Sequence, residues 1–283
     1  MIKPKKLHFA TAGIPLCIKD RDYIKGLQYN LDKNLSGLEM EFVRGVRMKE
    51  KNIPLIKEFV KNNNFLLTAH GPYYINLNAQ EDDKYEASLK RILDTARMAH
   101  KCGAYSITFH AAYYLQQDPD KVYDRVKKAL TDIVNTLKSE NIEIWVRPEL
   151  TGKSSQWGNL EELIQISKDV EMVLPCIDFS HMHARLNGYN GYDNFSRILE
   201  SMATKIGEVA LESFHGHVAG IEYTNKGEKK HLNLQDSDFK YKELIKALND
   251  FHVKGLIVCE SPNIEEDTKL LADLFHSLCN PNS

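Results

Sequence analysis

The stretch Tyr105-Ser106-Ile107-Thr108-Phe109-His110 is a short apolar run that closes on a histidine. Runs of this kind, rich in Ile, Phe, Val and Tyr, predict buried strands. The same pattern recurs along the chain, each time with a residue able to bind a metal at the end of the run: His70, His110, Glu149, Asp178, His217 and Glu260. Repeated placement of such residues after buried strands predicts that the strand ends converge on one site.

Strand-like and helix-like segments alternate over the whole length. We expect strands near residues 6–12, 38–43, 65–70, 105–110, 142–146, 172–178, 210–218 and 255–260. The clearest helices are expected over residues 86–102 and 121–137, where apolar residues recur at helical spacing. This alternation predicts an α/β fold, a (β/α)8 TIM barrel, as a single domain over residues 1–283. Residues 219–237 fit neither pattern, and we expect a long polar loop there, on the face that carries the six strand-end residues.

Composition narrows the function classes. Hydrophobic residues make up 42% and charged residues 27% of the chain, which is typical of a soluble globular protein. The net charge of −2 excludes the global basic field of a strong non-specific DNA binder, but it leaves room for a local basic patch. The five cysteines are scattered without a CxxC pair, so we expect reduced thiols. No apolar run is long enough to span a membrane, and the expected location is cytoplasmic.

The strand-end residues are imidazoles and carboxylates without thiolates. Such ligands suit Zn or Mn in sites that keep open positions for water and substrate. Two further histidines extend the set: His181 follows Asp178 by three residues, and His231 lies in the polar segment. Buried acids and imidazoles at one barrel mouth would be costly without a metal, because charged groups lose their hydration there. The sequence therefore predicts a polynuclear metal centre.

Two motifs resemble the endonuclease IV family of apurinic/apyrimidinic endonucleases. His-Gly-Pro-Tyr-Tyr-Ile-Asn-Leu (residues 70–77) resembles the family's histidine followed by Tyr-Leu-Ile-Asn-Leu, and Cys-Ile-Asp-Phe-Ser-His (residues 176–181) resembles its Cys-Ile/Leu-Asp-Thr-Cys-His signature. The resemblance covers nearly the whole chain. It implies a hydrolase of base excision repair, which binds duplex DNA and cleaves the phosphodiester 5′ to an abasic site.

The resemblance also implies a role for each candidate residue. Family members hold three zinc ions, the first here by His70, His110 and Glu149. Glu149, the implied catalytic carboxylate, would bridge to a second ion held by Asp178, His217 and Glu260, and His181 and His231 would belong to the third. The implied DNA contacts are Tyr73, which matches a tyrosine that enters the DNA, and Arg44 and Arg47, which match backbone contacts.

The third ion's motif departs from the family pattern. The family's Asp-x-His reads Lys229-Lys230-His231 here, so a lysine stands at the position of the carboxylate. Glu228 is adjacent and could substitute, but a shift of one residue usually points a side chain elsewhere. We therefore expect the Lys229 ammonium to replace the third ion electrostatically. That expectation gives a two-metal enzyme in which His181 and His231 bind no metal.

Two other readings of the same residues stay open. Sugar isomerases and epimerases of the xylose-isomerase-like superfamily hold one metal through Glu, Asp, His and Glu, a set that Glu149, Asp178, His217 and Glu260 would supply. Such enzymes do not require the additional histidines. The other alternative is a DNA- or RNA-binding relative without catalysis, in which Lys229 serves as a fixed cation. A monomer is expected in each case.

Overall fold

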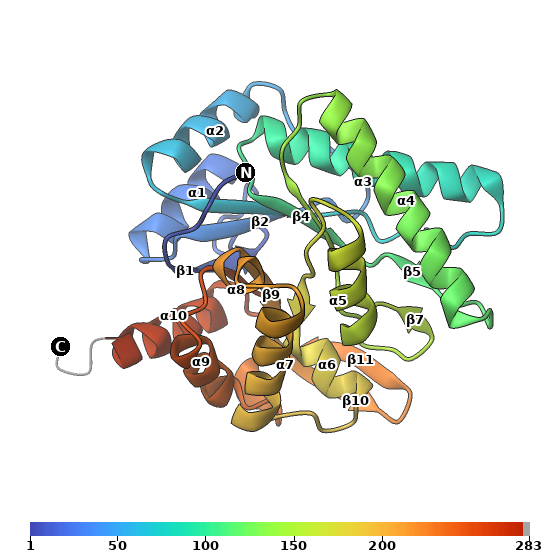
Figure 1. Cartoon of the computed structure of the whole chain (residues 1–283). Helices are drawn as coiled ribbons and strands as arrows, with labels where there is room; N and C mark the ends of the chain where they lie inside the picture. The colour runs from blue at the N-terminus through green and yellow to red at the C-terminus, as the bar shows by residue number, and fades with distance from the viewer. Residues whose placement is uncertain (280–283) are drawn as a thin grey trace.

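Eight parallel strands form the centre of the molecule (Figure 1). The computed structural model describes residues 1–279, so residues 280–283, the end of the predicted domain, lie outside the description. The sheet runs in the order β6-β4-β3-β2-β1-β12-β9-β8. These strands are β1 (Leu7–Ala12), β2 (Gly37–Glu41), β3 (Leu66–His70), β4 (Ser106–Phe109), β6 (Trp145–Pro148), β8 (Ile177–Asp178), β9 (Phe214–Val218) and β12 (Gly255–Cys259).

Parallel bridges between β6 and the segment before β8 close the sheet into a barrel. Val146 pairs with Val173, and Glu149 pairs with Cys176. Backbone hydrogen bonds continue across this seam, because the Cys176 amide donates to Pro148 and the Leu150 amide donates to Cys176. The prediction of an α/β TIM barrel is therefore confirmed.

Helices surround the barrel (Figure 1). They are α1 (Tyr23–Asp32), α2 (Asn52–Asn62), α3 (Asp82–Lys101), α4 (Pro119–Ser139), α5 (Leu160–Asp169), α6 (Phe179–Arg185), α7 (Tyr192–Lys205), α8 (Val209–Glu212), α9 (Tyr241–Asp250) and α10 (Glu265–Cys279). The expected helix over residues 121–137 lies within α4, whose buried residues run at helical spacing from Val122 to Leu137. The helix α3 ends beside Gly103, whose φ of +79° is a conformation that favours glycine. Among residues 1–279, no helix is both long and apolar enough to cross a membrane.

Three expected elements differ from the structure. Strand β6 begins only at Trp145, because residues 142–144, which follow the turn after α4, are irregular and form no strand pairing. The expected strand over residues 210–218 begins as the short helix α8 and becomes β9 only at Phe214. The expected strand over residues 172–178 is reduced to bridges followed by β8. Apolar runs of this length do not distinguish a strand from a buried helical turn.

The segment expected to be a long loop is a β-hairpin. Strand β10 (Gly220–Thr224) pairs in antiparallel fashion with β11 (Gly227–Leu232), and the 3-10 helix η1 (Leu234–Asp236) follows. A second small ribbon joins β5 (Ala112–Tyr113) to β7 (Gln156–Trp157). Both ribbons follow barrel strands at their carboxyl ends. They extend the mouth of the barrel, the end where active sites of this fold lie.

Candidate metal centre

The carboxyl ends of the barrel strands surround a cavity of about 420 Å³. Its lining includes His70 at the end of β3 and the residues directly after β4, β6 and β12, together with side chains of α6 and the hairpin. Asp178 and His217 do not line the cavity but share donor groups with residues that do. All eight predicted ligand positions thus belong to three groups that share members: His70, His110, Glu149, Asp178, His181, His217, His231 and Glu260. The structure thus brings together residues that are up to 190 positions apart in the sequence.

The first group contains His70, His110 and Glu149, whose donor atoms lie within 4.8 Å of one another. The Nδ1 of His70 lies 2.7 Å from the carbonyl oxygen of Gly71, so this nitrogen carries the hydrogen and donates it. The other nitrogen, Nε2, faces Glu149 at 3.1 Å. His110 Nε2 lies 3.4 Å from the second oxygen of the same carboxylate. Each oxygen of Glu149 therefore meets a different histidine.

The second group adds Asp178, His217 and Glu260 to Glu149. His217 Nδ1 lies 3.3 Å from Glu149 Oε1 and 3.4 Å from Glu260 Oε1. Asp178 caps helix α6, since one of its oxygens accepts a hydrogen bond from the His181 amide at 2.7 Å. Its other oxygen remains directed at the site. Glu149 belongs to both groups and therefore lies between them.

The third group contains Asp178, His181 and His231. Glu228 lies beside it, with its carboxylate oxygens 3.4 Å from His181 Nε2 and 3.9 Å from His231 Nε2. The Nδ1 atoms of both histidines face backbone carbonyls, Leu150 for His181 and Glu260 for His231. Both rings therefore present Nε2 to the cavity and to Glu228.

A β-bulge accounts for the position of Glu228. Tyr223 of β10 pairs with Glu228, and its neighbour Glu222 pairs with Lys230, so Lys229 is the extra residue on β11. In a regular strand, residues three apart point to opposite faces, and one extra residue restores them to the same face. Glu228 and His231 consequently share the face that lies over the barrel mouth.

The expectation for Lys229 was therefore wrong. Its side chain is 59% exposed and pairs with Glu222 on the outer part of the hairpin, not with the group at the mouth. The carboxylate that stands beside His181 and His231 is Glu228, one residue earlier than in the Asp-x-His motif. The two-metal prediction assumed a lysine cation beside His181 and His231, and the structure has a carboxylate there.

The chemistry of the donor atoms fits divalent metal ions. Within residues 1–279, Glu149 Oε1, Asp178 Oδ2, His217 Nδ1 and His231 Nε2 are buried and make no hydrogen bond. Buried polar atoms in proteins are nearly always hydrogen-bonded, so unpaired ones call for an explanation. These four atoms belong to the three ligand groups and point toward shared spaces. Metal ions would satisfy all of them at once.

The charges point the same way. Among residues 1–279, no lysine or arginine lines the cavity. Burial disfavours charge on Glu260, but His217 outweighs it and lowers the pKa of Glu260 to about 2. Burial also opposes charge on His70, yet Glu149 raises the pKa of His70 to about 10. The carboxylates of the cleft thus favour positive charge beside them, and metal ions would supply that charge in place of ring protons.

Strand β2 contributes two carboxylates that the sequence reasoning missed. Glu39 is fully buried, and Glu41 lines the cavity beside His70, its partner in the β2–β3 register. Burial raises the pKa of Glu41 to about 8. The sequence pattern that identified the other strand-end residues is also present here, because the short strand Gly37-Leu38-Glu39-Met40-Glu41 ends in an acidic residue. The expected strand extended to Val43, which hid Glu41 at the strand end.

The three expected DNA contacts lie at the rim of this cavity or on a nearby loop. Tyr73 is 61% exposed and its ring centroid is 6.3 Å from that of His70. It also borders a groove of about 810 Å³, whose lining includes the exposed rings of Tyr74 and Tyr113. Arg44 and Arg47 are exposed in the loop after β2. Their place after β2 puts them on the carboxyl side of the barrel.

The fold and the cleft define a class: parallel eight-stranded barrels with histidine and carboxylate donors gathered at the carboxyl ends of the strands. Residues 31–278 match the family described as "Xylose isomerase-like TIM barrel". The chain belongs to this family. It is 40% identical over 273 residues to an uncharacterised protein of Methanocaldococcus jannaschii, which covers 96% of this chain and 98% of that protein. It is 24% identical to a probable endonuclease 4 of Mycoplasma genitalium, over 80% of this chain and 74% of the relative.

Solved structures of two kinds resemble the barrel. Endonuclease IV from Thermus thermophilus superposes with a TM-score of 0.70 at 16% identity, covering 98% of this chain and 99% of that one. A D-tagatose 3-epimerase-like protein superposes with a TM-score of 0.72 at 17% identity, covering 96% of this chain and 98% of that one. At these identities the likeness extends to the fold alone. The choice between the two activities therefore rests on the residues of the cleft.

Proposed function

We propose that this chain is a metal-dependent phosphodiesterase that cleaves DNA on the 5′ side of abasic sites. The observation that carries the proposal is the presence of three overlapping donor groups in one cleft. A single-metal enzyme has no use for the first and third groups, whereas a trinuclear hydrolase needs all three. The relative named as a probable endonuclease 4 supports the same reading.

Each group would hold one zinc ion, with manganese as the other candidate. His70, His110 and Glu149 would hold the first, and Glu149, Asp178, His217 and Glu260 the second. His181 and His231 would hold the third, together with Asp178 and Glu228. Bound divalent ions supply Lewis acidity toward a phosphate and make water a usable nucleophile near neutral pH.

The protein's own residues would bind and orient the substrate. Glu149, placed between the first two groups, fixes their spacing and is the catalytic carboxylate of the proposal. Tyr73 stands at the rim, where its exposed ring can enter the gap left by a missing base. Arg44 and Arg47 would contact backbone phosphates. A nucleotide without a base is turned out of the duplex at lower cost than a paired one, and the cavity would receive it.

A sugar epimerase is the second candidate. The group of Glu149, Asp178, His217 and Glu260 is complete by itself, as a single-metal isomerase requires. The likeness to the epimerase-like structure favours it to the same degree as the likeness to endonuclease IV favours the nuclease. Under this alternative, His70, His110, His181, His231 and Glu228 would have no ligand role.

The deciding experiment offers the purified protein both kinds of substrate. We expect it to nick a duplex that carries one synthetic abasic site and to leave the undamaged duplex intact, with activity lost in a chelator and restored by zinc. D-tagatose and D-fructose should remain unchanged under the same conditions. Conversion of a ketose without nicking would select the epimerase. Tight binding to abasic DNA without cleavage by the zinc-loaded protein would select the non-catalytic alternative.

A second prediction concerns metal content. We expect three zinc ions per chain in protein prepared without chelator, since Glu228 completes the third group. Elemental analysis measures this directly. Removal of the ions should lower the melting temperature on the order of 10 °C, because ligands that bind only the folded state stabilise it. One ion per chain would contradict the trinuclear reading and favour the epimerase.

A further inference from the structure

A buried chain of polar side chains lies in the barrel interior next to the second donor group. It consists of Glu39 on β2, Thr68 on β3, Ser106 on β4, and His215 and His217 on β9, each with an exposed fraction of 0%. Glu39 pairs with Thr68 in the β2–β3 register, and Thr68 pairs with Ser106 in the β3–β4 register. The three strands thus place these residues side by side inside the barrel. Only His217 also belongs to the second donor group.

Glu39 is the centre of this chain. Its Oε1 lies 3.0 Å from His217 Nε2, and its Oε2 lies 3.1 Å from His215 Nε2. Thr68 donates its hydroxyl hydrogen to Oε2 at 2.8 Å. On the far side of His215, the Ser106 hydroxyl lies 2.9 Å from Nδ1. A carboxylate buried this deeply is stable only when hydrogen-bond donors or cations surround it. Thr68 supplies a hydrogen bond, and the two imidazoles lie at ion-pair distance.

We propose that Glu39 is a positioning residue that fixes the ring of His217 for metal binding. A carboxylate has no hydrogen to give, so the nitrogen that faces it must carry one. His217 Nε2 faces Glu39, which leaves Nδ1 with its lone pair toward Glu149 and Glu260. Carboxylates that hold the remote N–H of a ligating histidine set its tautomer and orientation. This inference rests on the proposed metal-dependent function.

His215 and Thr68 hold Glu39 in turn. Both contact Oε2, which leaves Oε1 for His217 alone. The Ser106 hydroxyl can donate to His215 Nδ1, and this fixes the His215 hydrogen on Nε2, where it meets Glu39. Donation then runs in one direction, from Ser106 to His215 and from His215, Thr68 and His217 toward Glu39, while His217 Nδ1 makes no hydrogen bond. The residues thereby form one fixed support under the His217 ligand.

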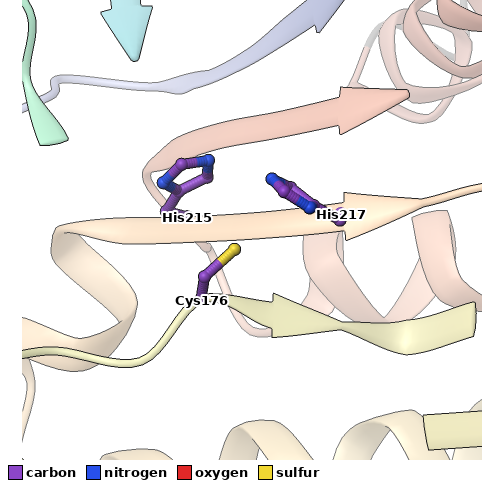
Figure 2. A group of neighbouring side chains, drawn as sticks. All are labelled: Cys176, His215 and His217. Atoms are coloured by element: carbon purple, nitrogen blue, oxygen red, sulfur yellow. The ribbon is translucent and has the colours of Figure 1, made fainter. Parts of the chain in front are cut away.

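A metal ion held by Cys176, His215 and His217 is the competing interpretation. Figure 2 shows the two rings on β9 and the thiol of Cys176 pointing toward them from the segment before β8. His217 already faces Glu149 and Glu260 with Nδ1 and Glu39 with Nε2. An ion at Cys176 would therefore compete either with the second group or with Glu39 for this ring. The positioning role uses both nitrogens without such competition.

Glu39→Gln tests the proposal because the amide keeps the shape and puts a donor where a second acceptor stood. We expect zinc affinity at the second group to fall by about 10- to 100-fold, measured by competition with a chromophoric chelator. Long-range ¹H–¹⁵N spectra of the zinc-loaded wild type should show His217 protonated on Nε2 and metal-bound through Nδ1. In Glu39→Gln that signal should be lost or moved. Glu39→Asp, which keeps the charge at a longer reach, should lie between the two and serves if the amide variant fails to fold.

A neighbouring substitution is the matched control. Cys176→Ser removes the thiol of Figure 2 and leaves Glu39 and its contacts in place. It should keep zinc stoichiometry, zinc affinity and the Nε2–H signal. Loss of one ion in Cys176→Ser, or unchanged affinity and spectra in Glu39→Gln, would overturn the proposal. A wild type that binds zinc with this tautomer but leaves abasic DNA intact would refute the proposed function and leave the positioning role standing.

Discussion

Replacing Glu149 with glutamine is expected to lower the rate of abasic-site cleavage by about 10³-fold, because one carboxylate belongs to two donor groups. The amide keeps the shape and loses the charge that meets His70 on one oxygen and His110 and His217 on the other. The barrel should stay folded, since the backbone of Glu149 keeps its hydrogen bond to Phe109. Single-turnover nicking and zinc content, measured on the same preparation, give the result.

Glu143→Gln is the matched control for this change. It makes the same substitution six residues earlier, on a side chain that is 74% exposed and pairs with the amino terminus at the other end of the barrel. We expect its rate to stay within about twofold of wild type, because exposed ion pairs contribute little. Near-normal turnover in Glu149→Gln would show that the catalytic carboxylate is elsewhere. Equal losses in both variants would point to an effect on folding.

The barrel could be predicted because its pattern is local and repeated. Each strand is a short apolar run, and a parallel barrel gathers the carboxyl end of every strand at one mouth. A residue such as His70 or Glu260 is therefore placed by its position in a run, without knowledge of distant contacts. This is why residues identified from strand ends alone lie within one cleft in the structure.

Prediction from strand ends was wrong or incomplete where the pairing between strands determines the position of a residue. The end of β2 at Glu41 is set by its register with His70, and an apolar run that continues to Val43 hides that end. The polar segment after β9 lacks the alternation of a buried strand, yet it pairs with itself as a hairpin. Glu39 has its role through His217, a contact between β2 and β9 that no local pattern reveals.

Replacing Glu228, the carboxylate on the hairpin, is expected to have the second large effect on zinc content and cleavage rate. Glu228→Gln should release one zinc ion and slow cleavage by about 10²-fold, since Glu228 stands beside both histidines of the third group. Lys229→Gln makes a matched change one residue later, where the side chain points to Glu222. It should retain all ions and a rate within about twofold of wild type. Elemental analysis and nicking rates distinguish the two variants.

Deleting Lys229 tests whether the bulge explains the displacement. Without the extra residue, Glu228 and His231 would be two apart on a regular strand and would still share a face. The deletion should therefore keep three ions and most of the activity. It shortens β11 by one residue, whereas Lys229→Gln changes only the side chain. If the deletion loses the third ion as Glu228→Gln does, a shared face is not sufficient, and the bulge is also needed to place Glu228 beside His181 and His231. If Glu228→Gln keeps three ions, Asp178 and the two histidines suffice, and the hairpin carboxylate is no ligand.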